Sequence, residues 1–167
     1  SEIANRGYVP TVYYIDEEAN EVAQARRICA ERKPYGILFL GSNLEYFTPD
    51  LEDLGIPCLL LTNSAATLNI PNLSSVSVDD VSASSLMIEY LYAQGHRKIG
   101  LIGGKPDQSR PSLSRLTGSQ SAMFRLGLPF EMEKQYAYAR FSLQSGYTAM
   151  EYLLKHCPDI TAVFAMS

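Results

Sequence analysis

Apolar runs alternate with helical patterns from one end of the chain to the other. Strand-like apolar runs occupy residues 9–15, 35–40, 58–61, 75–78, 98–102, 133–138 and 160–165. Between them, helical spacing together with helix start and stop residues predicts helices at 16–32, 44–54, 81–94, 112–126 and 143–156. Strands that alternate with helices are typical of α/β folds in which helices flank parallel sheets.

The starts and stops of these helices suggest a division of the chain. Asp16, Glu17 and Glu18 place negative charge at the start of the first full helix, where the helix dipole favours it. Gly95 stops the third predicted helix, and a new strand follows almost at once. We therefore expect a first lobe over residues 1–95 and a second lobe over residues 96–167.

The residues that follow the predicted strands are candidates for a ligand site. Ligands of open parallel sheets bind beyond the carboxyl ends of the strands. Polar or aromatic residues at these positions include Asn43, Thr62, Asn63, Phe141 and Ser167.

Composition narrows the classes of partner. The 167 residues are 46% hydrophobic and 19% charged, with a net charge of −4, which suits a globular protein with an apolar core. The densest basic cluster is only His96, Arg97 and Lys98, so we do not expect this chain to grip DNA itself. No apolar run approaches the roughly 20 residues that span a bilayer, so no membrane segment is predicted.

The motifs of several enzyme classes are missing. The 3 cysteines show no C-x-x-C spacing and are expected to be buried, small apolar side chains rather than zinc ligands. His96 and His156 fall at helix ends, and the pattern G-x-S-x-G does not occur. The glycine-rich residues 100–105 match neither phosphate-loop nor dinucleotide spacing. Asp79 and Asp80 are better explained as a helix cap than as a metal site. We expect no catalytic residue, cofactor or metal.

One stretch resembles a known family closely. Residues 78–104 contain V-D-D, a helix ending in Y-L-Y-A-Q-G-H-R-K-I, and an apolar strand followed by two glycines. This is very similar to the pattern V-D-N, Y-L-x-x-x-G-H-R-x-I and G-G of the LacI/GalR transcription regulators. Further matches in the family's order lie at residues 35–42, 55–61, 115–118, 146–150 and 161–165. The resemblance covers essentially the whole chain, which is identified as a member of this family.

The resemblance implies a periplasmic-binding-protein-like α/β fold of two lobes, each with a parallel sheet between helices in three layers. A sugar, sugar derivative or nucleobase would bind between the lobes and change their arrangement in a cytoplasmic homodimer. That change would alter the affinity for operator DNA, which such regulators bind through a helix-turn-helix head that this chain lacks. We expect a core truncated at both ends, without its first strand and with an incomplete second lobe.

A periplasmic sugar-binding protein of a transport system shares this fold and is the alternative. It would be made with a secretory signal and would act as a monomer. The motif Gly95-His-Arg-Lys-Ile-Gly100 and the cysteines, which suggest no disulfide framework, favour the regulator.

The family pattern also suggests roles for individual residues. Arg115 matches the arginine that reaches the ligand, since a guanidinium offers a rigid fork of donors; the alternative is a surface arginine at a helix start. Phe141 matches an aromatic ring beneath the ligand, with core packing as the alternative. Ser167 matches a position that hydrogen-bonds the ligand.

The remaining candidates are less specific. Thr62 stands where the family often has an aspartate, which puts a carboxylate contact to a sugar in doubt. Asn43, Asn63 and Arg110 are expected nearby and complete the set of candidate ligand-binding residues.

Overall fold

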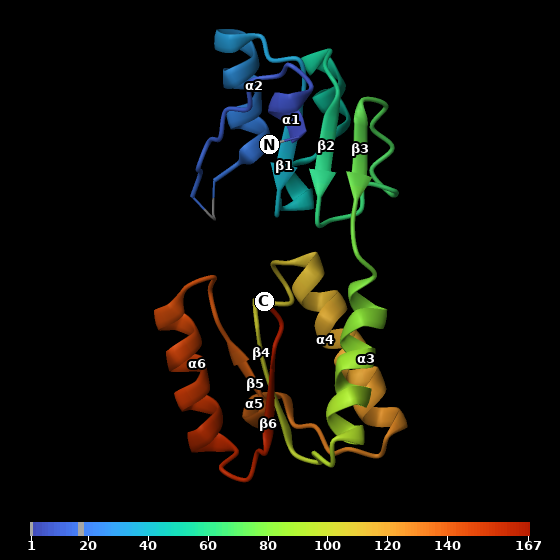
Figure 1. The fold of residues 1–167 in the computed structure, drawn as a ribbon, viewed down its shortest axis with the longest axis vertical. Helices are drawn as coiled ribbons and strands as arrows, with labels where there is room; N and C mark the ends of the chain where they lie inside the picture. The colour runs from blue at the N-terminus through green and yellow to red at the C-terminus, as the bar shows by residue number, and fades with distance from the viewer. Residues whose placement is uncertain (1, 17–18) are drawn as a thin grey trace.

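Two parallel sheets form the centres of two lobes (Figure 1). The computed structural model describes residues 2–16 and 19–167. The sheet of the first lobe has the strand order β1-β2-β3, and that of the second has the order β5-β4-β6. All strand pairs in both sheets are parallel. The predicted α/β fold with parallel sheets is confirmed.

The first lobe contains strands β1 (Ile37–Leu40), β2 (Cys58–Leu61) and β3 (Leu73–Val76), with helices α1 (Glu2–Asn5) and α2 (Glu21–Arg32). Helix α2 begins where the Asn20 side chain accepts a hydrogen bond from the Ala23 amide over 2.9 Å. Phe39, Leu51 and Leu60 are buried together in the core of this lobe.

The second lobe contains strands β4 (Ile99–Gly103), β5 (Tyr136–Tyr138) and β6 (Ala162–Ala165). Its helices are α3 (Asp80–Ala93), α4 (Arg110–Arg125), α5 (Met132–Gln135) and α6 (Leu143–His156). Figure 1 shows α3 and α4 on one side of the sheet and α6 on the other, so this lobe has three layers. The predicted range of α6 is confirmed at both ends.

Helix α3 packs with the second lobe. Its residue Ile88 is fully buried in one cluster with Ile99 and Leu101 of β4. After β3 the chain passes once from the first lobe to the second in a short connecting segment and then enters α3 (Figure 1). We therefore propose that the lobes divide at residues 77–79, ahead of the expected division after residue 95.

Residues 9–15 do not form the predicted strand. Their apolar side chains lie open to solvent, with Val9 91% and Tyr14 95% exposed. A strand needs a neighbour to complete its backbone hydrogen bonds, and no strand of the described residues pairs with this segment. The expected helix start at Asp16 is also wrong, because α2 begins at Glu21. Glu17 and Glu18 lie outside the described residues.

Three further predictions needed adjustment. The segment 44–54 forms two 3₁₀ helices, η1 (Leu44–Tyr46) and η2 (Pro49–Leu54), instead of one α-helix. Pro49 causes the break, because the residue before a proline avoids the helical conformation. Strand β3 begins two residues earlier than predicted, at Leu73. The segment 133–138 divides between the short helix α5 and the strand β5.

Candidate functional site

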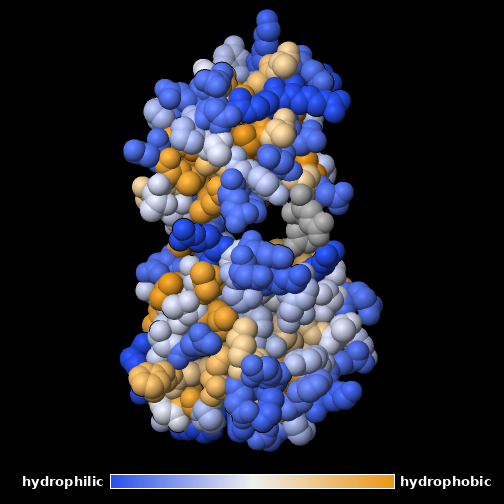
Figure 2. All heavy atoms as spheres, turned by 180° about the vertical axis from the view of Figure 1, so that it is seen from behind, coloured by the Kyte–Doolittle hydropathy of each residue, from blue (hydrophilic) through white to orange (hydrophobic). Residues whose placement is uncertain are grey.

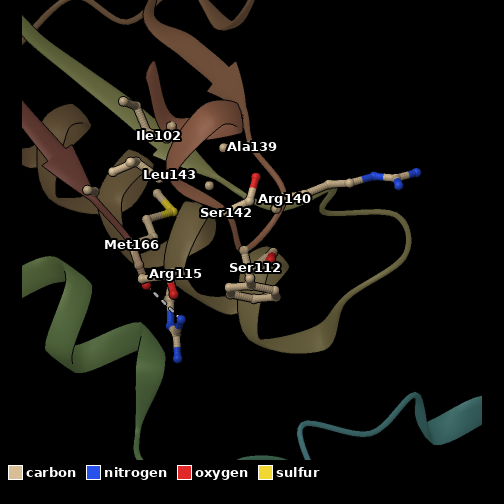
Figure 3. A pocket seen from close by; sticks show the side chains of 14 residues that line it. Ile102, Ser112, Arg115, Ala139, Arg140, Ser142, Leu143 and Met166 are labelled. Carbon is tan, nitrogen blue, oxygen red and sulfur yellow. Dashed lines mark hydrogen bonds between the residues drawn. The ribbon is translucent and has the colours of Figure 1, made fainter. Parts of the chain in front are cut away.

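A pocket of about 550 Å³ opens at the carboxyl edge of the second sheet. It lies beyond the ends of β4, β5 and β6 and beside the N-terminal turns of α4 and α6 (Figure 3). Figure 2 shows that the molecule narrows to a waist between its lobes, and this edge of the sheet faces that waist. The lining residues are Ile102, Gly103, Gly104, Ser112, Arg115, Ala139, Arg140, Phe141, Ser142, Leu143, Gly146, Ala165, Met166 and Ser167.

Arg115 is held in the pocket wall by two hydrogen bonds. Its Nε donates to Oδ1 of Asp80 over 2.8 Å, and one terminal nitrogen donates to the Met166 carbonyl over 2.7 Å. The side chain is 28% exposed, so the guanidinium is fixed in position and still reaches solvent. The rest of its donor fork is available to a ligand.

Gly118 explains how Arg115 comes so close to helix α3. A Cβ atom on Gly118 would lie 2.1 Å from the carbonyl oxygen of Val81. The absence of a side chain therefore lets α4 cross α3 at short range. Because Arg115 is one helical turn before Gly118, this close crossing brings it to the first residue of α3, Asp80.

An aromatic ring stands open at the mouth of the pocket. Phe141 is 75% exposed and directly precedes Ser142, the N-cap of α6. Two side-chain hydrogen bonds hold the turn that carries Phe141. Ser142 Oγ accepts from the Ser145 amide, and Ser145 Oγ accepts from the Arg140 amide. An exposed ring on a fixed turn offers a flat apolar face to a ligand.

The base of the pocket is built from close contacts around two glycines. The Tyr136 hydroxyl donates to the Gly104 carbonyl, and burial raises the pKa of Tyr136 to about 12. A Cβ atom on Gly103 would lie 2.5 Å from that hydroxyl, and one on Gly104 would lie 2.6 Å from Oγ of Ser112. Neither glycine can be replaced without moving the pocket wall.

Three of the seven predicted ligand residues meet in this pocket, namely Arg115, Phe141 and Ser167. Ser112 was missed by the sequence reasoning. It precedes Arg115 by three residues on α4, so helical spacing alone places the two side chains on one face. That spacing was the available signal.

The other four predicted residues do not line the pocket. Asn63 is buried, and its amide donates to the Ser42 carbonyl over 2.6 Å. Asn43 caps η1, with its side chain accepting from the Glu45 amide. Thr62, at the end of β2, has a φ of 80°. Arg110 is exposed at the start of α4.

The histidines and cysteines lie outside the pocket. His96 Nδ1 is 2.9 Å from the Thr161 hydroxyl, and the His156 ring stacks on Tyr152. Cys58 and Cys157 are buried as expected, whereas Cys29 is only partly buried. Within residues 2–16 and 19–167, no group of three potential ligands could hold a metal ion.

A pocket beyond parallel strands, with a fixed arginine and an open ring, defines a small-molecule-binding domain of the periplasmic-binding-protein class. The family model "Periplasmic binding proteins and sugar binding domain of LacI family" matches residues 4–167. The chain belongs to this family, as its sequence motifs indicated.

Two relatives of the chain are transcriptional regulators, in agreement with this family. The chain is 30% identical to the HTH-type transcriptional repressor CytR of Escherichia coli over 166 residues, which is 98% of this chain and 47% of CytR. It is 30% identical over 135 residues, 79% of this chain, to the transcriptional regulator CelR of Thermobifida fusca, of which it covers 38%. The chain thus spans about half the length, or less, of these relatives.

Solved structures show the same fold. A CelR–cellobiose complex superposes with a TM-score of 0.75 at 26% identity, covering 98% of this chain and 49% of the other. The regulator CcpA of Lactococcus lactis superposes with a TM-score of 0.78 at 21% identity, covering 98% and 58%. The periplasmic-binding-protein-like fold is confirmed.

Proposed function

We propose that this chain is the effector-sensing core of a LacI-family transcriptional regulator. A sugar, sugar derivative or nucleobase binds in the pocket beside Arg115 and changes the arrangement of the lobes, and that change alters the affinity for operator DNA. The observation that carries the proposal is the pocket itself, which Arg115, Phe141 and Ser167 line together at the carboxyl edge of the second sheet.

The relatives support sensing rather than transport or catalysis. CytR and CelR are transcriptional regulators, and the related CelR structure is a complex with cellobiose. No helix in the described part of the chain is long and apolar enough to cross a membrane. We propose further that the regulator acts as a homodimer in the cytoplasm and that a separate helix-turn-helix head binds the DNA.

Thr62, Asn63 and Asn43 remain candidates on the first lobe, and Arg110 remains a candidate at the start of α4. Each lies in a loop or helix start that follows a strand. Closure of the lobes around a ligand would bring the first-lobe loops toward the Arg115 pocket.

The test is ligand-dependent stability in the purified regulator. We expect one member of a panel of sugars, nucleosides and nucleobases to raise the melting temperature by roughly 3 °C or more at saturating concentration. Arg115→Ala should abolish this shift. Arg125→Ala is the matched control, because Arg125 lies on the same helix outside the pocket and pairs with Glu89.

The same ligand should change the affinity for operator DNA in a mobility-shift assay. A ligand-dependent shift that survives Arg115→Ala would remove this pocket from the proposal. A ligand that stabilises the protein without any effect on DNA binding would argue for transport instead.

A further inference from the structure

The charged side chains that line the pocket are arginines, and no carboxylate from the described residues lines it. The polar side chains of the lining are Ser112, Arg115, Arg140, Ser142 and Ser167. From this cationic lining we infer that the effector presents an anionic group, a phosphate or a carboxylate, to the second lobe. The inference rests on the proposed function, in which this pocket holds the effector.

Three backbone carbonyls at the pocket already accept hydrogen bonds. The Gly103 carbonyl accepts from the Ala139 amide over 2.8 Å, and the Met166 carbonyl accepts from Arg115 over 2.7 Å. The Gly104 carbonyl accepts from a tyrosine hydroxyl at the pocket base. The side-chain acceptors that the described lining offers to a neutral sugar are serine hydroxyls, and that of Ser142 already accepts from the Ser145 amide.

Donors, by contrast, are open to a ligand. Ser112 is only 7% exposed and lines the pocket, and its hydroxyl has no hydrogen-bond partner among the described residues. This hydroxyl opens onto the pocket, where it can donate to a bound acceptor. Nη2 of Arg115 likewise has no protein acceptor within the described chain.

The first turn of α6 adds backbone donors beside Ser112 and Arg115. Leu143 lines the pocket, and the amides of Leu143 and Gln144 belong to the first turn of a 14-residue helix, where no intrahelical acceptor exists. The Ser142 hydroxyl caps only the Ser145 amide. A helix start of this kind favours negative charge through its dipole and its free N–H groups.

Asp80 does not cancel this preference. Its carboxylate accepts from Nε of Arg115 over 2.8 Å and lies outside the lining of the pocket. The pair, with the bond to the Met166 carbonyl, fixes the guanidinium at the pocket wall. Arg140 extends away from the other labelled side chains and makes its own contact with Tyr138, so the inference does not depend on it.

The test uses simple anions as probes of the purified regulator. Inorganic phosphate and sodium acetate are titrated by calorimetry at constant ionic strength, with glucose and cytidine as neutral comparators. We expect phosphate or acetate to bind with a millimolar dissociation constant, and the stronger of the two identifies the effector group as phosphate or carboxylate. Ser112→Ala should weaken that binding about tenfold through loss of a charge-assisted hydrogen bond. Ser121→Ala, an exposed serine on the same helix outside the pocket, should leave it unchanged.

The outcomes separate this inference from the proposed function. Absence of binding by either anion at about 100 mM excludes the anionic group. Equal binding by the parent and Ser112→Ala shows that the anion binds elsewhere and overturns the inference for this pocket. A neutral ligand whose stabilisation depends on Arg115 but not on Ser112 would uphold the proposed function and overturn this inference. Loss of anion binding only in Ser112→Ala, and not in Ser121→Ala, supports it.

Discussion

Arg115 on α4 is joined to Asp80, the first residue of α3, by a hydrogen bond of 2.8 Å from Nε to Oδ1. Asp80 comes directly after the segment 77–79 that connects the two lobes. The pair therefore ties the candidate pocket to the point where the chain passes between the lobes. A ligand that draws on the Arg115 guanidinium acts beside the connection whose geometry sets the lobe arrangement.

Removing either partner should destabilise the second lobe. The Asp80 side chain is 12% exposed and the Arg115 side chain 28% exposed, so the charge left behind loses its partner in a partly buried place. We expect Asp80→Ala and Arg115→Ala each to lower the unfolding free energy by about 2 kcal/mol. Urea denaturation of both variants and of the double variant measures this. Fully additive effects would show that the two side chains are not coupled.

Gly118→Ala should be among the most destabilising single-methyl changes in the chain. The new Cβ would lie 2.1 Å from the Val81 carbonyl oxygen, a backbone atom that cannot turn aside. We expect a loss of about 3 kcal/mol, or a shift of α4 away from α3. Gly146→Ala on α6 is the control, because its Cβ meets nothing within 4 Å. That change should stabilise the protein by about 0.5 kcal/mol, and equal losses at both glycines would contradict the crossing argument.

The sequence predicted elements best where their signals were local. Helix α6 has an N-cap at Ser142, an amphipathic face and a proline soon after its end, and its predicted range is correct. Residues 9–15 carry equally strong strand propensity but form no strand, because strand formation depends on a partner that no local pattern supplies. The division of the lobes after residue 95 stays a prediction, and the boundary that we propose at residues 77–79 rests on the packing of α3 against β4.

The residues of the candidate site also differ in how far the sequence could predict them. Family motifs suggested Arg115 and Phe141 as ligand residues, and both line the pocket, although Arg115 lies in the second turn of α4 and not at its start. Asn63 also follows a strand, but its amide turns inward to the Ser42 carbonyl, and strand position alone does not fix that orientation. Ser112 carries no distinctive motif, and its unpaired hydroxyl becomes visible only in three dimensions.

Thr62 is strained in the native state. Its φ of 80° is a left-handed backbone conformation, which is unfavourable for a β-branched residue. We expect Thr62→Gly to raise the unfolding free energy by about 1 kcal/mol, because glycine adopts this conformation freely. Thr62→Ala keeps a Cβ atom and should raise the unfolding free energy much less. Thermal unfolding distinguishes them, and a Thr62→Gly variant no more stable than Thr62→Ala would show that the strain is absent.

Cys58 should make the protein sensitive to alkaline pH. Burial, and secondly the charge of neighbouring Cys29, raise the pKa of the Cys58 thiol from 9.0 to about 11. In the unfolded chain the thiol titrates at its ordinary pKa, so between these values the folded state holds more protons than the unfolded state. Stability from this group is therefore complete below about pH 9 and falls as pH rises toward about 11.

Cys58→Ala isolates this effect from other alkaline titrations. Urea denaturation at several pH values from about 8 to about 11 should show stability falling less steeply in the variant, by up to about 2 kcal/mol across the range. Cys29→Ala should change the slope less than Cys58→Ala, because Cys29 is only partly buried and its charge is the smaller of the two causes that raise the pKa of Cys58. Parallel curves for the parent and Cys58→Ala would mean that the Cys58 thiol titrates alike in the folded and unfolded states, and would contradict this prediction.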